Sequence, residues 1–236
     1  MILLTITIDP QGWGVGNTDD IYHVLLSVYR VFAPCFQDKL NTQDLLVVHS
    51  DQYPVSYRRH NVILLSAHDC YWCNYAYQFA HELCHLQIPS KVPQQLRWFE
   101  ESLCELASYY FLPRISDLWK VDPPYANWST YADAFTTYVQ DDMKKATPFD
   151  LNLLSNPSAM EYLSQNEYDR GKNAYIAINL LPIFESDPEL WSAVPLLFSA
   201  PERSTITEAL HHWHDHVPEK HQNSIERILR VFSMTP

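Results

Sequence analysis

Short apolar runs and one amphipathic stretch alternate along the first third of the chain. Residues 2–8 (ILLTITI) end in alternating apolar and polar side chains, the pattern of a half-buried strand. Residues 18–32 space their apolar side chains three or four positions apart, as an amphipathic helix does. Residues 45–49 and 61–67 are apolar runs bounded by polar turns, so we expect a strand, a helix and two further strands in that order.

The next amphipathic stretch predicts a longer helix that begins near residue 71. It contains no Gly or Pro over residues 71–80, and its apolar side chains recur every four positions. Pro89 and Pro93 predict the end of this helix and a turn of the chain. A second helix is then expected over residues 94–112.

The first of these two helices carries the sequence His-Glu-Leu-Cys-His. His81 and His85 are four residues apart, so on a helix they lie one turn apart on the same face, where both imidazoles can reach one metal ion. Glu82 is adjacent and can take a proton from a water molecule bound to that ion. His-Glu-x-x-His on a helix is therefore typical of zinc-dependent hydrolysis, and Zn²⁺ is the cofactor that we predict.

The second helix supplies carboxylates. Glu101 and Glu105 are one turn apart on one of its faces. A tetrahedral catalytic zinc takes three protein ligands and keeps one position open, and two His with one Glu is a common ligand set.

Together, the two helices resemble a family of enzymes. HELCH followed by Trp98-Phe99-Glu100-Glu101-Ser102-Leu103 is similar to the gluzincin metallopeptidases, and most similar to the aminopeptidase N-like catalytic domain. There HExxH is followed by W-x-x-E-G, and the resemblance implies that Glu101 is the third zinc ligand. Ser102 stands where the family has Gly, and fifteen residues separate His85 from Glu101 where the family usually has eighteen. Glu105 is the alternative ligand, since its spacing of nineteen residues resembles the thermolysin branch.

Hydrogen bonding to the ligands favours Glu101 over Glu105. A metal-bound His normally donates its second ring N–H to a carboxylate or a carbonyl. If Glu101 binds the metal, Glu105 one turn later can accept that hydrogen bond. If Glu105 binds instead, the residue one turn later is Tyr109, a poorer acceptor. We therefore predict His81, His85 and Glu101 as metal ligands, with Glu105 supporting a histidine.

A further motif resembles the Y-x-K-G segment of the same family. It reads Asn166-Glu167-Tyr168-Asp169-Arg170-Gly171, with Arg170 in the position of the family's Lys. The resemblance implies that the Tyr168 hydroxyl stabilises the oxyanion of the tetrahedral intermediate, assisted by Arg170. Gly171 is the only Gly after residue 16, which indicates a close backbone approach or an unusual dihedral angle there.

The remaining pattern is almost wholly helical, so we expect an α+β protein with a zincin-like fold of two lobes. Residues 1–90 would form an N-terminal lobe with a small mixed β-sheet and the HExxH helix. Residues 91–236 would form an all-helical C-terminal lobe with the third ligand and Tyr168, and the active site would lie in the cleft between them. The segment Val62–Ser66 is the expected sheet edge that pairs with an extended substrate.

Composition narrows the class of protein further. The formal net charge of −12 argues against a nucleic-acid partner, which needs a basic surface. No apolar run is long enough for a membrane span. Cys84 and Cys104 fall inside the two predicted metal helices, and the odd total of five Cys also argues for free thiols and a cytoplasmic location. Cys70 and Cys73 form an isolated CxxC, which we interpret as packing at a helix start.

The sequence thus predicts a zinc-dependent metallopeptidase that acts on a peptide or protein substrate, with Glu82 as the general base. The alternative is a catalytically silent zincin-fold module for binding or scaffolding, in which zinc is structural. Hydrolysis of an ester or epoxide by the same centre is a third possibility. The oligomeric state is left open by the sequence.

Overall fold

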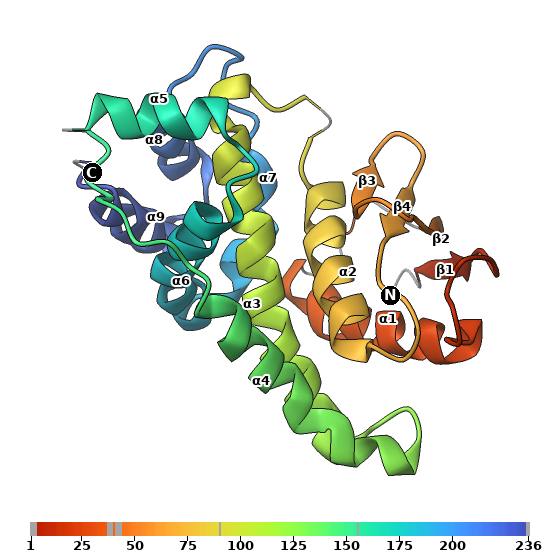
Figure 1. The fold of residues 1–236 in the computed structure, drawn as a ribbon. Helices are drawn as coiled ribbons and strands as arrows, with labels where there is room; N and C mark the ends of the chain where they lie inside the picture. The colour runs from red at the N-terminus through yellow and green to blue at the C-terminus, as the bar shows by residue number, and fades with distance from the viewer. Residues whose placement is uncertain (1–3, 37–39, 41–43, 90, 155, 235–236) are drawn as a thin grey trace. The chain divides into compact units, whose positions relative to one another are not determined.

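The protein is an α+β protein in which a small mixed sheet occurs near the N-terminus and helices dominate the remainder (Figure 1). The computed structural model describes residues 4–36, 40, 44–89, 91–154 and 156–234. Its contacts divide the chain into two compact units, one of Met1–Gln87 with Ala107–Asp142 and one of Ile88–Leu106 with Met143–Pro236. The predicted class and the small mixed sheet are confirmed.

The sheet of the first unit contains three parallel strands and one antiparallel strand. Its strands are β1 (Thr5–Ile8), β2 (Asp44–His49), β3 (Val55–Tyr57) and β4 (Val62–Leu65), in the spatial order β1-β2-β4-β3. β3 pairs antiparallel with β4, and the other neighbours are parallel. The first two residues of the predicted N-terminal strand lie outside the described residues.

The prediction that Val62–Ser66 forms the sheet edge is wrong. β4 pairs with β2 on one side and with β3 on the other, so β3 is the edge strand next to it. The three-residue β3 was missed because it is too short to show a periodic pattern. A tight turn joins β3 to β4, and Asn61 in that turn has a φ of 50°, a conformation that Asn tolerates better than most residues.

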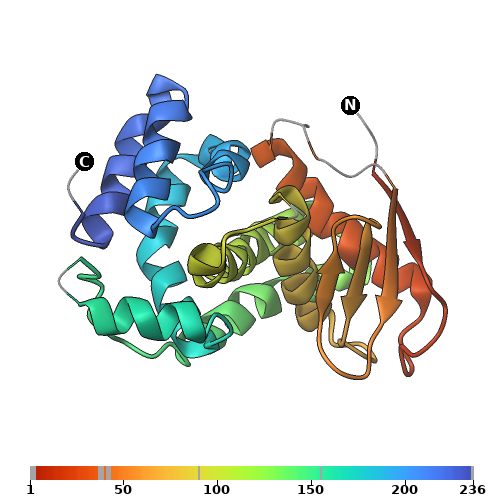
Figure 2. The ribbon, with the colours of Figure 1, turned by 90° about the horizontal axis from the view of Figure 1, so that it is seen from above.

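Two helices cover one face of the sheet (Figure 2). They are α1 (Thr18–Phe32), which the 3-10 turn η1 (Ala33–Phe36) follows, and α2 (Trp72–Gln87). Leu45, Val47, Ile63 and Leu65 point to this face and are buried. Leu46 points to the opposite face and is 39% exposed, so the sheet is amphipathic, as the alternating pattern predicts.

Gln78 fixes α2 to the end of the sheet. Its Oε1 accepts hydrogen bonds from the backbone N–H groups of Ser66 (2.8 Å) and Ala67 (3.1 Å), which follow β4. Its Nε2 donates to Ser66 Oγ and to Asn74 Oδ1, both at 3.1 Å. One side chain therefore satisfies two backbone donors that have left the sheet and sets the position of α2 one turn before the HELCH motif.

The helix α3 (Arg97–Val121) is longer than predicted. The 3-10 turn η2 (Gln94–Leu96) precedes it, and it continues past Leu112 through Pro113. Pro113 removes one helical hydrogen bond, but Phe111, Leu112 and Ile115 beside it are fully buried, and their burial offsets that loss. α3 begins in the second unit and belongs to the first from Ala107 onward.

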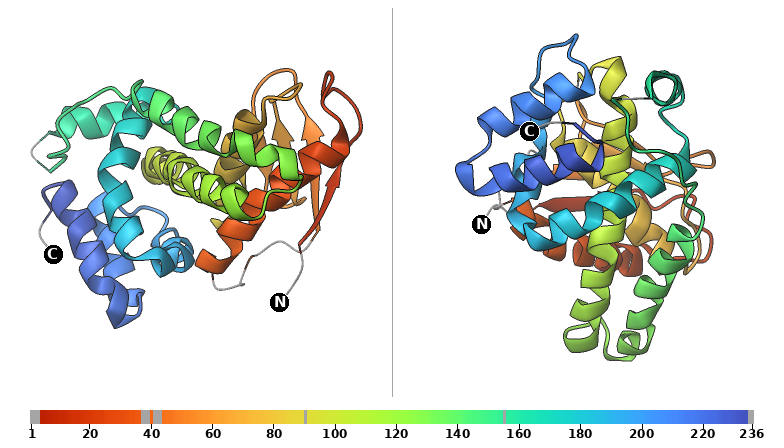
Figure 3. Two further views of the ribbon diagram at one scale, coloured as in Figure 1. Left: turned by 90° about the horizontal axis from the view of Figure 1, so that it is seen from below. Right: turned by 90° about the vertical axis from the view of Figure 1, so that its left-hand side faces the viewer.

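Partly buried polar contacts join α3 to its neighbours in the first unit. Ser108 Oγ donates to the Tyr77 carbonyl of α2 at 2.8 Å. The hydroxyls of Tyr77 and Tyr109 both donate to Asp142 Oδ2 at 2.9 Å, which ties α2 and α3 to α4 (Ala132–Met143). Figure 3 shows α4 alongside the end of α3, and η3 (Ala126–Tyr131) precedes α4.

The second unit contains no strand among its described residues. Its elements after residue 143 are α5 (Pro157–Gln165), α6 (Arg170–Ser186), η4 (Pro188–Ala193), α7 (Val194–Leu197), α8 (Ile206–His216) and α9 (Glu219–Val231). The capping box of Thr205 and Glu208 at the start of α8 is present as its sequence indicates. Pro182 lies inside α6.

We expect Gln78→Ala to lower the free energy of unfolding by about 1–3 kcal/mol, because the Ser66 and Ala67 N–H groups lose their acceptor. Urea denaturation measures this loss. Gln165→Ala is the matched control, since Gln165 is exposed and, among the described residues, its side chain bonds to Glu161 on its own helix. Equal stability of the two variants would show that Gln78 does not anchor α2.

Candidate metal centre

His81 and His85 lie one turn apart on α2, as the sequence predicts. Their ring centroids are 5.0 Å apart with an interplanar angle of 63°. His85 is buried, whereas His81 retains partial exposure. This arrangement gives two imidazole donors on one helical face, with one of them reachable from solvent.

Cys104 on α3 is the third member of the group. His81, His85 and Cys104 each offer one ligand atom, and these atoms lie within 4.8 Å of one another. Ligand atoms around a tetrahedral zinc are separated by about 3.3–3.8 Å, as bond lengths of about 2.0–2.3 Å require. Small side-chain adjustments therefore suffice, and the donor set of two imidazoles and a thiol fits zinc.

The continuity of α3 and its hydrogen bond to α2 account for the position of Cys104. Ser108 of α3 bonds to Tyr77 of α2. Cys104 lies one turn before Ser108 on α3, and His81 lies one turn after Tyr77 on α2. This is the register expected of neighbouring helices that run in opposite directions. The contact that fastens the helices thus brings Cys104 and His81 to the same level.

Sequence reasoning missed Cys104 as a ligand, although its spacing carried a signal. Eighteen residues separate His85 from Cys104, the spacing of the third ligand in the family that the motifs resemble. The resemblance implies a Glu as third ligand, and Glu101 and Glu105 flank Cys104, so the sequence points to these carboxylates before the thiol.

Arg58, in the turn after β3, binds the C-terminal end of α2. Its Nε donates to the His85 carbonyl at 2.6 Å, one of the last carbonyls of α2 that lack a partner within the helix. Its Nη2 lies 3.1 Å from His85 Nδ1. Arg58 thereby caps α2 and contacts the His85 ring.

The predicted carboxylates lie on the same two helices. Glu82 (3% exposed) and Glu105 (7% exposed) are buried, and Glu101 is partly exposed. Glu82 as the base, Glu101 as a ligand and Glu105 as a partner of a histidine stay predictions. Glu101 precedes Cys104 by three residues, so both side chains lie on neighbouring parts of one helical face.

Tyr168 lies in the turn before α6 and is 72% exposed, and Arg170 is the first residue of that helix. Buried Asn173 connects this turn to α3. Its Nδ2 donates to the Glu167 carbonyl at 2.8 Å, and its Oδ1 accepts from Ser102 Oγ at 3.2 Å. Asn173 thus links the Tyr168 segment to Ser102, the residue next to Glu101.

Gly171 permits a close approach between the start of α6 and Thr147. A close backbone approach is one of the two reasons for this Gly that the sequence indicates. Its carbonyl accepts from the Thr147 N–H at 2.8 Å. A Cβ at this position would lie 2.4 Å from Thr147 Oγ1, a clash that excludes larger residues without movement of Thr147. The catalytic roles of Tyr168 and Arg170 stay predictions.

The other cysteines and histidines have different environments. Cys70 is exposed, whereas Cys73 is buried and donates to the Tyr131 hydroxyl at 3.3 Å. Burial raises the pKa of the Cys73 thiol to about 11. On α8, the rings of His212 and His216 stack at 4.0 Å, and burial lowers the pKa of His212. Among the described residues, His81, His85 and Cys104 form the one group of three or more His, Cys, Asp or Glu side chains that could hold a metal ion.

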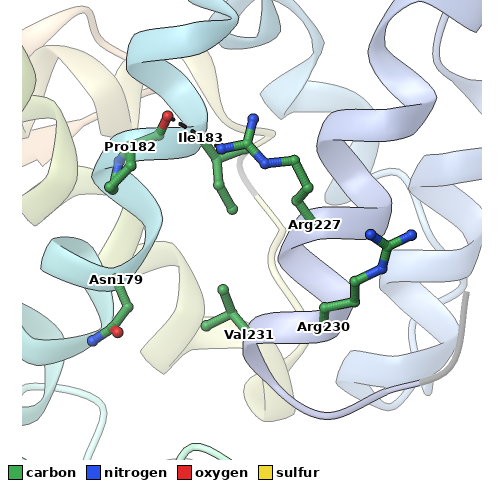
Figure 4. A pocket seen from close by; sticks show the side chains of 6 residues that line it. All are labelled: Asn179, Pro182, Ile183, Arg227, Arg230 and Val231. Carbon is green, nitrogen blue, oxygen red and sulfur yellow. Dashed lines mark hydrogen bonds between the residues drawn. The ribbon is translucent and has the colours of Figure 1, made fainter.

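A shallow pocket on the second unit offers no comparable chemistry (Figure 4). Its lining residues are Asn179, Pro182, Ile183, Arg227, Arg230 and Val231. Arg227 donates to Ser186 Oγ at 2.6 Å and Arg230 pairs with Glu226 at 3.0 Å, so both guanidinium groups are engaged. The lining contains no carboxylate, thiol or imidazole.

No protein-family model matches the chain, and no curated protein or solved structure is significantly similar to it. No described helix combines the length and the apolar character that a membrane crossing requires.

We expect Cys70 to be alkylated roughly a hundredfold faster than Cys73 at about pH 8, because only the thiolate reacts and the raised pKa of Cys73 keeps its thiol protonated. Mass mapping after a timed iodoacetamide pulse measures both rates on separate peptides. The rate of Cys73 should climb as the pH approaches about 11. Equal rates would contradict the buried position of Cys73.

Proposed function

We propose that the protein is a zinc-dependent metallopeptidase of the gluzincin type, with a zincin-like arrangement of the HExxH helix and the helix that follows it. The observation that carries this proposal is the group of His81, His85 and Cys104, whose ligand atoms lie within 4.8 Å of one another. Glu82 next to His81 supplies the base that a hydrolytic site needs and a purely structural site does not.

Zinc bound to this group would lower the pKa of a water molecule and polarise the substrate carbonyl. Glu82 accepts the proton of the attacking water and delivers it to the leaving amine. The Tyr168 hydroxyl donates a hydrogen bond to the developing oxyanion, and Arg170 adds positive charge. In support of this role, Asn173 links the turn of Tyr168 to α3 beside Glu101.

An extended peptide would add to the sheet at β3 (Val55–Tyr57), the edge strand next to β4. Arg58 follows β3 directly and bonds to His85, so this edge ends next to the metal helix. Main-chain pairing along an edge strand recognises any extended peptide. The sequence also lacks the Gly-x-Met-Glu-Asn segment that anchors a substrate amine in the aminopeptidase N-like enzymes. We therefore favour a peptidase without strict recognition of the amino terminus.

The second candidate is a structural zinc, and the position of Glu101 supports it. Glu101 and Cys104 lie on one face of α3, and if both bound the metal, four protein ligands would close the coordination sphere. Such a site would leave no position for water, and the protein would act as a binding or scaffolding module.

We expect the purified protein to contain one equivalent of zinc and to cleave members of a fluorogenic peptide library. Glu82→Gln should retain the zinc and lower kcat by about 100- to 10,000-fold, because the general base is lost. Elemental analysis and the library assay measure the two quantities. Glu202→Gln, at an exposed turn of the second unit, is the control and should behave as the wild type.

Normal cleavage by Glu82→Gln would disprove the role of Glu82 as base. One equivalent of zinc with no cleavage of any library member would favour the structural module over the peptidase.

We expect Tyr168→Phe to lower kcat by about 100-fold with zinc content and KM little changed, because the hydroxyl acts only when the oxyanion forms. Tyr71→Phe is the control, since Tyr71 is similarly exposed (60%, against 72% for Tyr168) at the start of the HExxH helix. If both variants keep wild-type kcat, another group must stabilise the oxyanion.

A further inference from the structure

We propose that the third protein ligand of the metal centre is the thiolate of Cys104, so that the site is a His₂Cys centre instead of the His₂Glu centre that the motifs imply. This inference rests on the metal centre of the proposed function, but it concerns only which atoms bind the ion.

Geometry is the first argument. Cys104 Sγ is a member of the group whose ligand atoms lie within 4.8 Å of one another. The hydrogen bond between Ser108 and Tyr77 fixes the level of α3 against α2 one turn away, so the approach of Cys104 to His81 follows from the helical repeat.

Spacing along the chain is the second argument. Only fifteen residues separate His85 from Glu101, whereas eighteen separate it from Cys104. The difference of three residues moves a side chain about 4.5 Å along a helix axis, since each residue rises about 1.5 Å. The group of ligand atoms within 4.8 Å of one another contains Cys104 and does not contain Glu101.

The chemistry of the side chains is the third argument. Cys104 is fully buried, and Glu101 is partly exposed. A thiolate is a strong ligand for zinc, and the metal itself keeps the thiol deprotonated.

Cobalt substitution tests the ligand directly, because a thiolate bound to Co²⁺ gives an intense near-ultraviolet charge-transfer band that nitrogen and carboxylate ligands do not give. The apo-protein is titrated with Co²⁺ alone, and zinc affinity is measured by competition with a chelator. We expect the band in the wild type and its absence in Cys104→Ser. We also expect zinc affinity to fall by at least about 100-fold in that variant, more than the loss of a supporting residue causes.

Cys84→Ser is the matched control, since Cys84 is equally buried and adjacent to His85 but is not part of the group. Its band and affinity should match those of the wild type. Glu101→Gln should keep the band as well. Cys104→Asp should bind Co²⁺ without the band, so a folding defect of Cys104→Ser would not prevent the test.

A wild-type protein that binds Co²⁺ without the band would overturn the inference, as would loss of metal in Glu101→Gln with the band unchanged in Cys104→Ser. Peptide cleavage in the same preparation separates this outcome from the proposed function. Cleavage without the band would disprove only the Cys104 thiolate as a ligand. The band without cleavage would disprove only the peptidase activity.

Discussion

The register between α2 and α3 is the constraint on which the candidate site depends. Two histidines on one helix provide only part of a metal site, and the third ligand must come from another element at the same level. The hydrogen bond from Ser108 to the Tyr77 carbonyl sets that level. The shared acceptor Asp142 holds Tyr77 and Tyr109 beside it. Because these polar contacts are at least partly buried, a shift by one turn would leave several groups unsatisfied.

The helix α2, which carries both histidines, is also held at two points along its length. Gln78 connects its first half to the residues that leave β4, and Arg58 caps its last turn. The sheet thus positions α2 at two places, through the residues that follow β4 and through Arg58 in the turn after β3. Such support on rigid elements is what a metal site needs to hold its ligands at short distances.

Local sequence signals predicted the elements that depend on local physics. The HELCH helix, α1 and the capping box of α8 follow from side-chain period and end signals that act within a few residues. The misses have tertiary causes. β3 is stabilised by pairing with β4, and α3 passes Pro113 because its surroundings are buried.

The candidate site likewise has a part that the sequence reveals and a part that depends on packing. His81, Glu82 and His85 are adjacent along one helix, so their motif is visible in the sequence. Cys104 joins them only through the packing of a second helix, and a single Cys separated from His85 by eighteen residues carries no signal that outweighs two nearby carboxylates. The proximity of Cys104 to the two histidines is therefore visible only in the structure.

X-ray absorption at the zinc edge of the zinc-loaded protein tests the central claim most directly, because it counts the atoms around the ion by element and distance. The account predicts one sulfur at about 2.3 Å and three nitrogen or oxygen atoms at about 2.0–2.1 Å, with the imidazole scattering of two histidines. A protein that takes up no zinc, or a zinc whose surroundings contain no sulfur or fewer than two imidazoles, would contradict it.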